Sequence, residues 1–283
     1  MSESIGNKII RLIEVGSTNT YIKDHSNLLK QHGLAVIAQM QTSGRGRTGK
    51  KFVSIPQKNL TFSVVLHPNL PIGEVQIFSL LAGVVVARVL DKYIRGVRLK
   101  WPNDVLVNEK KICGILIETI TTPENIFPVL IMGIGLNTKG YQKEYPRELR
   151  KIITTIEEEI LINRNSIHKG KEPIQIENET IFNKILNELD FCIKKFIEKK
   201  RKIYSFDCVS KARNNLLDEW MKRSQSKGRK VRCLNNLEDQ KNSSVIVGTI
   251  EGLSAEGYLQ IKTDSGEIMT HVCGDIIEIR EDR

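Results

Sequence analysis

Apolar and polar positions follow a strand-like pattern through the first half of the chain. Short apolar segments there are separated by turns that contain glycine, proline or asparagine, which is typical of strands joined by tight connections. The ranges predicted as strands are Lys8–Glu14, Leu34–Met40, Leu60–His67, Val97–Trp101, Val105–Asn108, Ile112–Ile120 and Phe127–Asn137, the last broken by Gly133 and Gly135. Helical spacing predicts a polar helix over Thr20–Gln31, which Ser17 or Thr18 can cap, and a buried helix over Glu74–Tyr93. Few helices between many strands favour an α+β fold in which a mixed sheet is backed by helices.

After Asn137 the pattern becomes helical. Apolar spacing predicts an amphipathic segment over Leu149–Ile160, a long helix over Ile181–Ile197 and a further helix from Ser205 to Trp220, while Asn163–Pro173 is predicted to be a loop. From Val231 onward short strands and glycine turns return over roughly 50 residues, a size typical of a small β-barrel. We therefore expect two domains, residues 1–226 and residues 227–283.

Charge adds a preference for anionic partners. The 283 residues include 43 Lys+Arg and 33 Asp+Glu, a formal net charge of +10. Nucleic acids, nucleotides and acidic protein domains are all candidates on this ground. Much of the excess lies in Lys194–Arg201 and Lys222–Arg232, which are interpreted as solvated faces of helices and a linker.

The cysteines and the N-terminal residues indicate the expected cellular location. The five cysteines form no C-x-x-C pair and have no histidine at ligand spacing, which argues against a zinc site and a disulfide framework. The N-terminal residues lack the basic and apolar regions of a signal peptide. The longest apolar run, Ile77–Leu90, is too short to span a bilayer. A reducing cytoplasm is therefore the expected location.

One loop carries the strongest chemical signal. Residues Gly44-Arg45-Gly46-Arg47-Thr48-Gly49-Lys50 place three glycines and three cations in seven positions, directly after a predicted strand. Glycines allow backbone N–H groups to converge on an anion, and arginines add planar donor groups suited to phosphate or carboxylate oxygens. The loop is therefore predicted to bind a polyanion.

The sequence of this loop fits two familiar phosphate-binding motifs poorly. The pattern Gly44-x-Gly46-x-x-Gly49 matches the dinucleotide fingerprint, but that motif requires a helix directly after its glycines. A P-loop would require Ser or Thr after Lys50, and the residue is Lys51. The residues that follow show no helical period and include Pro56. The loop must therefore bind phosphates in another framework.

Five motifs along the chain, in this order and spacing, resemble those of biotin protein ligases. The resemblance covers nearly the whole chain, and five linked motifs are far more specific than any one. The matching segments are Gly16–Asn19, Gln41–Lys50, Lys100-Trp101-Pro102-Asn103-Asp104, Lys110–Glu118 and Gly133-Ile134-Gly135-Leu136-Asn137.

The resemblance implies a fold and an activity. It implies a catalytic domain related to class II aminoacyl-tRNA synthetases, followed by an SH3-like C-terminal domain. Such an enzyme uses ATP and Mg²⁺ to convert biotin into biotinoyl-AMP, and then transfers biotin to a lysine of a biotin carboxyl carrier domain. Bifunctional members carry a DNA-binding domain before the first motif, and only 16 residues precede Ser17. The expected type is therefore monofunctional, a monomer or homodimer, with neither DNA nor a membrane as partner.

The resemblance also implies roles for single residues. Neutral side chains at the first motif and at Gln41 suit the donors and acceptors of biotin's ureido ring, Gly114 permits close approach of backbone to ligand, and the loop cations neutralise phosphates. The expected biotin-binding residues are Ser17, Thr18, Asn19, Gln41, Arg45, Gly46, Arg47, Lys111 and Gly114. The expected ATP- and adenylate-binding residues are Lys50, Phe52, Asn103 and Asn137, and the expected catalytic residues are Arg45, Arg47, Lys111 and Asp104. No residue is singled out as a metal ligand.

Individually, several of these residues have structural interpretations. Ser17 or Thr18 can be a simple N-cap, Lys111 a surface lysine on the polar bend Asn108–Lys111, and Asn103-Asp104 an ordinary turn. Trp101 is interpreted as a core residue.

The sequence departs from the family pattern at two loop positions and in one insertion. Phe52 stands where Trp is common, and Lys50 stands where Arg is frequent, which gives a point charge instead of a planar donor group. The segment Leu161–Pro173 looks longer than is usual.

Two alternative functions stay open. A lipoate ligase-like acyl transferase shares the catalytic fold, although the Gly-Arg-Gly-Arg loop and the Lys-Trp-Pro-Asn-Asp run favour biotin. A non-enzymatic nucleic-acid-binding protein would be supported by the positive charge alone.

Overall fold

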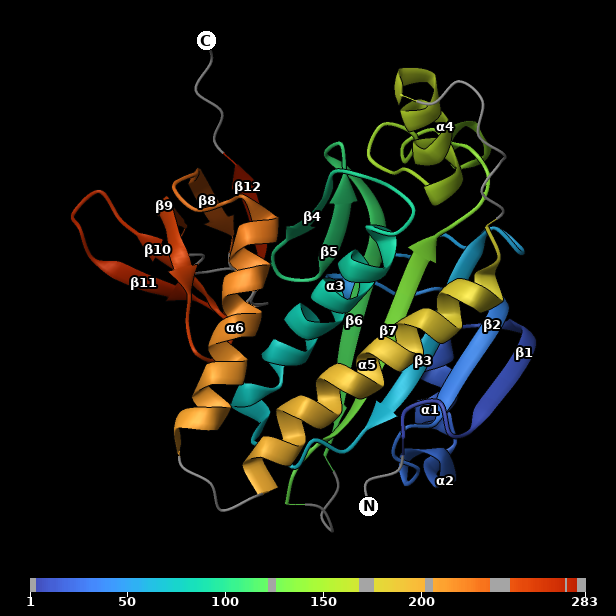
Figure 1. Cartoon of the computed structure of the whole chain (residues 1–283), viewed down its shortest axis with the longest axis horizontal. Coiled ribbons are helices and arrows are strands. Elements are labelled where there is room, and N and C mark those ends of the chain that lie inside the picture. Colours follow the sequence, from blue (N-terminus) through green and yellow to red (C-terminus); the bar gives the residue numbers. More distant parts are fainter. Residues whose placement is uncertain are drawn as a thin grey trace.

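A seven-stranded mixed sheet forms the centre of the first unit (Figure 1). The computed structural model describes residues 4–121, 126–167, 176–201, 206–234, 245–272 and 274–278. The strand order is β1-β2-β3-β7-β6-β5-β4, in which β1 and β2 are parallel and all other neighbours are antiparallel. The strands are β1 (Ile9–Val15), β2 (Ala35–Gln41), β3 (Asn59–Leu66), β4 (Val97–Lys100), β5 (Asp104–Val107), β6 (Lys110–Ile120) and β7 (Val129–Asn137).

Helices cover both faces of this sheet. The helices are α1 (Thr18–Asp24), α2 (Ser26–Leu29), α3 (Gln76–Leu90), α4 (Ile156–Ile167), α5 (Asn178–Arg201) and α6 (Phe206–Ser224). In Figure 1, α3, α5 and α6 lie in front of the sheet, and α1 and α2 lie behind it. Short 3₁₀ turns at Arg47–Gly49, Ile72–Glu74 and Gln142–Glu144 complete the connections. The predicted α+β fold, a mixed sheet backed by helices, is confirmed.

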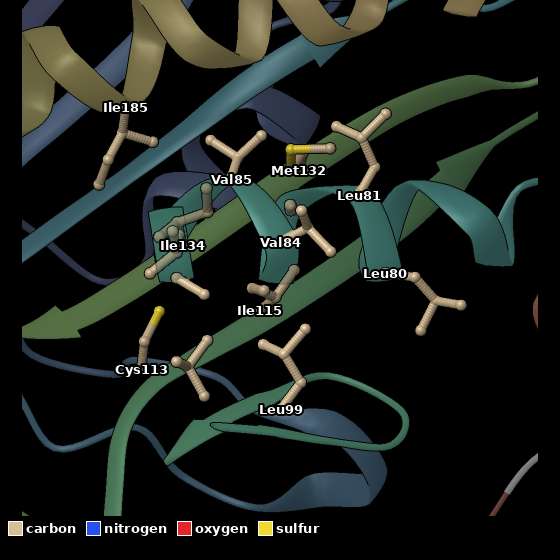
Figure 2. Packing of buried hydrophobic residues seen from close by; sticks show 14 of the residues in the cluster. Leu80, Leu81, Val84, Val85, Leu99, Cys113, Ile115, Met132, Ile134 and Ile185 are labelled. Atoms are coloured by element: carbon tan, nitrogen blue, oxygen red, sulfur yellow. The ribbon is translucent and has the colours of Figure 1, made fainter. Parts of the chain in front are cut away.

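Helix α3 is the centre of the core. Its residues are apolar on nearly every side because the sheet lies beneath it and α5 and α6 lie beside it. Figure 2 shows Leu80, Leu81, Val84 and Val85 packed against side chains from β4, β6, β7 and α5. With the residues before it, the run that the sequence suggests is too short to span a bilayer becomes Ile72–Leu90, which is long and apolar enough to cross one. However, 67% of its 18-residue apolar window is buried inside the protein, as in the core helix of a globular domain.

The two faces of the sheet differ because strand side chains alternate. In β7 the even positions from Leu130 to Leu136 belong to the core beneath α3. Val129 and Ile131, on the opposite face, pack in a second cluster with α1 and α2. Continuing along that face, the next positions are Gly133 and Gly135. The sheet surface therefore loses its side chains at this point and becomes a hollow.

A separate five-stranded antiparallel sheet ends the chain. Its strands are β8 (Lys230–Leu234), β9 (Ile246–Leu253), β10 (Leu259–Lys262), β11 (Ile268–His271) and β12 (Asp275–Glu278), in the order β11-β10-β9-β8-β12. The indole of Trp101 donates a hydrogen bond of 3.0 Å to the carbonyl of Gly257, and the hydroxyl of Tyr258 donates one of 2.9 Å to the carbonyl of Gly73. Trp101 is buried, as predicted for a core residue. The change from α6 to β8 falls near the predicted boundary at residue 227, and the division into two domains remains a prediction.

Three predicted elements differ from the structure. The helix predicted over Thr20–Gln31 is two helices, because the ring nitrogen Nδ1 of His25 lies 2.7 Å from the carbonyl of Tyr21, where the helical ladder would place the His25 N–H. The segment predicted as helical from Leu149 becomes helical only at Ile156, because Ile153 pairs with Lys111 beside β6 instead. Strand β7 is not broken at its glycines, because β3 and β6 pair with it on both sides.

The prediction of a loop over Asn163–Pro173 is wrong at its start, because α4 continues to Ile167. Residues 168–173 of that range, and Ser205, the predicted start of the last helix, lie outside the described residues.

A charged cluster joins the three helices on the core side. Arg88 of α3 donates through Nε to Glu219 of α6 at 3.0 Å and through Nη1 to Glu188 of α5 at 2.8 Å. Arg223 also donates to Glu219, at 3.0 Å. The hydrogen bond from Arg88 is the main cause that lowers the pKa of Glu219, against the opposing effect of burial. The folded state therefore favours the ionised carboxylate.

We expect Glu219→Gln to lower the free energy of unfolding by about 0.5–1.5 kcal/mol near pH 7, a value reduced for partial solvent exposure. Because the folded pKa lies below the unfolded one, this contribution is fully present above about pH 5 and is lost as pH falls through the folded pKa. Urea unfolding of wild type and variant at pH 7 and pH 3 measures it. Glu179→Gln is the control, since Glu179 and its partner Arg11 are each 53% exposed. An equal difference between wild type and Glu219→Gln at both pH values would contradict the assignment.

Candidate functional site

The hollow at the glycines of β7 is a cavity of about 420 Å³. The first turn of α1, the glycine loop and the segment that follows β7 close over it. All the residues that the sequence predicts for the site line this cavity. They are Ser17, Thr18, Asn19, Gln41, Arg45, Gly46, Arg47, Lys50, Phe52, Asn103, Asp104, Lys111, Gly114 and Asn137.

The glycine loop is a short hairpin. The amide of Gly46 donates to the carbonyl of Lys50 at 2.7 Å, and the amide of Phe52 donates to the carbonyl of Gly44 at 2.9 Å. A side chain at Gly44 would meet that neighbouring backbone, since its Cβ would lie 2.4 Å from the carbonyl oxygen of Phe52. Thr48 and Gly49 at the tip have positive φ values of 49° and 73°. As predicted, no helix follows this loop; the chain continues to β3.

A polar cluster lines the end of the cavity at α1. Ser17 is the N-cap residue of α1 by its backbone conformation, but its side chain makes no capping hydrogen bond. The backbone amide of Thr18 donates to the side-chain carbonyl of Gln41 at 2.8 Å. The hydroxyl of Ser63 lies 2.6 Å from both the Thr18 hydroxyl and the Asn19 side-chain carbonyl. Buried donors and acceptors in a fixed arrangement can recognise a polar ring that carries both.

Lys111 and Asp104 form an ion pair within the cavity. The ammonium of Lys111 lies 2.6 Å from a carboxylate oxygen of Asp104, and both side chains are partly exposed. The interpretation of Lys111 as a bend residue is wrong, because Lys111 belongs to β6. The turn before this strand lies at Asn108 and Glu109, whose φ values are positive. Its amide donates to the carbonyl of Ile152 at 2.8 Å, which fixes the strand beside the cavity.

Gly114 has a different neighbour from the one expected. A Cβ at Gly114 would lie 2.9 Å from the end of the Lys111 side chain. The glycine therefore makes room for Lys111, while its expected contact with a ligand remains a prediction. Asn103, next to Asp104, donates from its side chain to the carbonyl of Ile115 at 2.6 Å, which anchors the β4–β5 turn to β6.

The opposite end of the cavity contains a buried amide cluster. Asn59 donates to the side-chain carbonyl of Asn137 at 2.8 Å and lies 3.0 Å from the hydroxyl of Tyr145. Asn137 donates in turn to the carbonyl of Thr154 at 3.1 Å. Burial raises the pKa of Tyr145 to about 12, so its hydroxyl stays protonated at neutral pH. The ring of Phe52 lies against Gly135, where a Cβ would approach it to 2.7 Å.

The charges around the cavity are mainly positive. Arg45, Arg47, Lys50, Lys51 and Lys111 line it, and among the described residues of its lining the only carboxylate is Asp104. The C-terminal sheet reaches the same region: His271 of β11 lies against Trp101, with ring centroids 5.3 Å apart. Burial first, and then the charge of Arg47, lower the pKa of His271. The imidazole is therefore neutral near pH 7 and adds no charge. The cavity favours anions because its lining has five cations and one carboxylate among the described residues.

Several residues at or beside the cavity were not predicted from the sequence. Predicted site residues are contacted by Ser63, Glu118 and Asn59. Tyr145 contacts Asn59 and lines the cavity, and Gly133 and Gly135 form its floor. For the glycines a signal existed, because two glycines separated by one residue in a strand lie on the same face. Tyr145 follows an irregular connection, and no periodic pattern marks it.

Comparisons with known proteins show which families the chain resembles. The sequence model of the Biotin/lipoate A/B protein ligase family matches residues 12–137, and that of the Biotin protein ligase C terminal domain matches residues 236–277. The chain is 28% identical to the "Bifunctional ligase/repressor BirA" of Escherichia coli over 276 residues, which cover 96% of this chain and 74% of the relative. The protein of the same name from Bacillus subtilis is 32% identical over 157 residues, 55% of this chain and 48% of the relative. The chain thus matches about half the length of that relative.

Solved structures show the same fold. The structure titled "Biotin protein ligase from Aquifex aeolicus in complex with biotin and ATP" superposes with a TM-score of 0.71 at 28% identity, and the match covers 97% of this chain and 100% of the other. The apo structure of the same protein superposes with a TM-score of 0.67 at 25% identity.

The floor of the cavity should not accept a methyl group. A Cβ at Gly133 would lie 2.5 Å from the Asn19 side-chain oxygen, so we expect Gly133→Ala to displace Asn19 from Ser63 and to lower the free energy of unfolding by about 1–3 kcal/mol. Urea unfolding measures this loss. Gly16→Ala is the matched control, because apart from its two chain neighbours no described residue has an atom within 4 Å of the place that its Cβ would take. It should change stability by less than about 0.5 kcal/mol. If both variants lose the same stability, the contact between Gly133 and Asn19 is not the cause.

Proposed function

We propose that this chain, which belongs to the biotin protein ligase family, is an ATP-dependent ligase that activates biotin as biotinoyl-5′-AMP and transfers biotin to a lysine of an acceptor domain. One observation carries the proposal: a single cavity has a neutral hydrogen-bonding cluster at one end and cations with a buried amide cluster towards the other. Such a cavity fits a polar ring joined to a nucleotide.

The first reaction joins two anions, so it depends on position and charge. A carboxylate oxygen of biotin attacks the α-phosphorus of ATP, a bond from phosphorus to that oxygen forms, and pyrophosphate leaves with the electrons of the broken P–O bond. Arg45 and Arg47 would neutralise the phosphates, and Lys111 would hold the carboxylate against the phosphorus. Because Asp104 holds the Lys111 ammonium in place, this cation is already positioned before the charge develops.

The second reaction transfers the acyl group. The uncharged amine of an acceptor lysine attacks the acyl carbon, a C–N bond forms, the C–O bond to AMP breaks, and the amine gives up a proton. Asp104 is the carboxylate in the cavity lining that can hold the incoming ammonium and accept that proton. Asn137, Phe52, Lys50 and Asn103 would retain the adenylate while the acceptor approaches.

Mg²⁺ is part of this proposal. Among the described residues no group of three or more His, Cys, Asp or Glu side chains could hold a metal ion. Mg²⁺ is usually bound by substrate phosphates with one or two carboxylates, and Asp104 of the cavity lining is the candidate here. The ion would supply neutralisation of the triphosphate charge.

The partner and location extend the proposal further. We infer that the acceptor is a biotin carboxyl carrier domain of a carboxylase, since relatives from Mycobacterium tuberculosis and Paracoccus denitrificans carry the name "Biotin--[acetyl-CoA-carboxylase] ligase". A cytoplasmic location, a monomer or homodimer, and the absence of DNA and membrane partners remain predictions from the sequence.

Mass spectrometry of an isolated biotin-acceptor domain tests the function directly. After incubation with this protein, ATP, Mg²⁺ and biotin, the acceptor should gain the mass of one biotinoyl group, which is biotin less one water, on one lysine. A parallel reaction with lipoate tests the alternative acyl transferase, which shares the matched family. Modification by lipoate alone would replace the proposed substrate, and modification by neither would refute ligation.

Lys111→Ala should slow pyrophosphate release in the presence of biotin by about tenfold to a hundredfold, because a hydrogen bond to a charged group is worth about 1.5–3 kcal/mol. The circular dichroism spectrum should not change, because the backbone bonds of residue 111 remain. Lys110→Ala is the matched control, since Lys110 is the preceding residue of β6 and does not line the cavity. Equal pyrophosphate-release rates in the two variants would show that Lys111 has no role in the first reaction.

Asp104→Asn should still form biotinoyl-AMP but transfer it slowly, with the deficit decreasing as pH rises. A lysine amine with a pKa of about 10.4 is mostly protonated at neutral pH and attacks only when uncharged, so an alkaline solution replaces the missing base. Supplying purified biotinoyl-AMP isolates this reaction from the first one. Transfer equal to wild type across pH 7 to 9 would leave Asp104 as a partner of Lys111 alone.

A further inference from the structure

Glu118 lies beside the site, and the proposed chemistry does not use it. It belongs to β6 and faces the same side of the sheet as Gly114 and Leu116, which line the cavity. Its side chain is only 15% exposed. Side chains from α1 and from the glycine loop, which are distant in sequence, meet at this single carboxylate.

The first contact fixes the direction of an amide. The side-chain nitrogen of Asn19 donates to Glu118 at 2.9 Å, while the side-chain oxygen of Asn19 lies 2.6 Å from the Ser63 hydroxyl. An ionised carboxylate only accepts hydrogen bonds, so it must face the NH₂ group of the amide. Asn19 is buried, so this pairing determines which of its polar atoms face the cavity.

The second contact holds the loop. Nη1 of Arg45 lies 3.2 Å from one carboxylate oxygen of Glu118, and the ammonium of Lys23 lies 3.2 Å from the same oxygen. A guanidinium has five N–H donors, so contact through Nη1 leaves capacity for a second anion. One carboxylate between two cations also leaves a net positive charge, which does not repel an anionic ligand.

We infer that Glu118 is a positioning residue of the proposed ligase: it orients Asn19 towards the polar ring of biotin and holds Arg45, and with it the glycine hairpin, over the bound adenylate. The inference depends on the proposed function for the identity of the ligand. It adds a residue that acts through two others and touches no reacting atom. Its loss should therefore affect ligand retention more than the bond-forming reactions.

Glu118→Gln and Glu118→Ala separate the two contacts. The glutamine carbonyl can still accept from Asn19, but it lacks the charge that holds Arg45. For Glu118→Gln we expect the release rate of preformed biotinoyl-AMP to rise about three- to tenfold, with KM for biotin within about twofold of wild type. Glu118→Ala also frees the Asn19 amide, so KM for biotin should rise about tenfold while KM for ATP stays within about twofold.

A double variant tests whether Glu118 acts through Arg45. In an Arg45→Gln background, Glu118→Gln should not speed adenylate release any further, because the ion pair is already absent. Glu251→Gln is the control. Glu251 is a carboxylate in the C-terminal sheet whose oxygen lies 3.9 Å from the ammonium of Lys227, and this substitution should leave the release rate of biotinoyl-AMP unchanged. An equal effect of Glu118→Gln with and without Arg45 would overturn the proposed link.

Hydrogen exchange of the peptide spanning residues 42–52 provides a readout that needs no reaction. In the ligand-free protein the Glu118→Gln variant should exchange this peptide faster than wild type, while peptides of α3 keep their protection. Unchanged exchange together with unchanged adenylate release would refute the role of Glu118. If wild type forms no biotinoyl-AMP, the proposed function fails, and the exchange result still decides whether Glu118 holds the loop.

Discussion

The alternation of side chains along β7 is the constraint on which the rest of the structure depends. One face of this strand must fill the space beneath α3, and it does so with Leu130, Met132, Ile134 and Leu136. The other face must leave space, and Gly133 and Gly135 provide it. Since both requirements fall on one strand of nine residues, the core and the cavity share a wall. The packing that stabilises the fold therefore also fixes the floor of the site.

Polar groups around that floor are held by contacts between elements distant in sequence. Ser63 of β3, Asn19 of α1 and Glu118 of β6 form a chain of hydrogen bonds. At the other end Asn59, Asn137 and Tyr145 form a second one. Buried polar groups that are mutually satisfied stay in one arrangement, because any rotation would leave a donor or acceptor without a partner. A binding site for a ring and a nucleotide requires such fixed directions.

The C-terminal sheet contacts the unit of the large sheet at a motif next to the cavity. Trp101 donates to Gly257 and lies against His271, while its near neighbours Asn103 and Asp104 line the cavity. The second sheet thus contacts, through Trp101, the turn that leads into Asp104. The charge of Arg47 in the glycine loop lowers the pKa of His271 in β11, so the loop and the C-terminal sheet interact electrostatically. This arrangement gives the smaller sheet a part in shaping the site.

The sequence by itself determined the strands of the large sheet, the buried helix α3 and the predicted site residues, all of which line the cavity. Strand alternation and linked motifs are local or ordered along the chain, so they can be recognised in one dimension. Tertiary structure alone decided that Lys111 pairs with Asp104, that Gly114 accommodates Lys111, and that Glu118 meets Arg45 and Lys23. It also decided where local spacing gives the wrong element. Ile152 and Ile153 follow Leu149 at helical spacing, but the backbone of Lys111 in β6 pairs with this segment instead. The hydrogen bonds between Lys111 and the segment at Ile152 join residues about 40 positions apart and leave no periodic trace in the sequence, so this pairing could not be predicted from it.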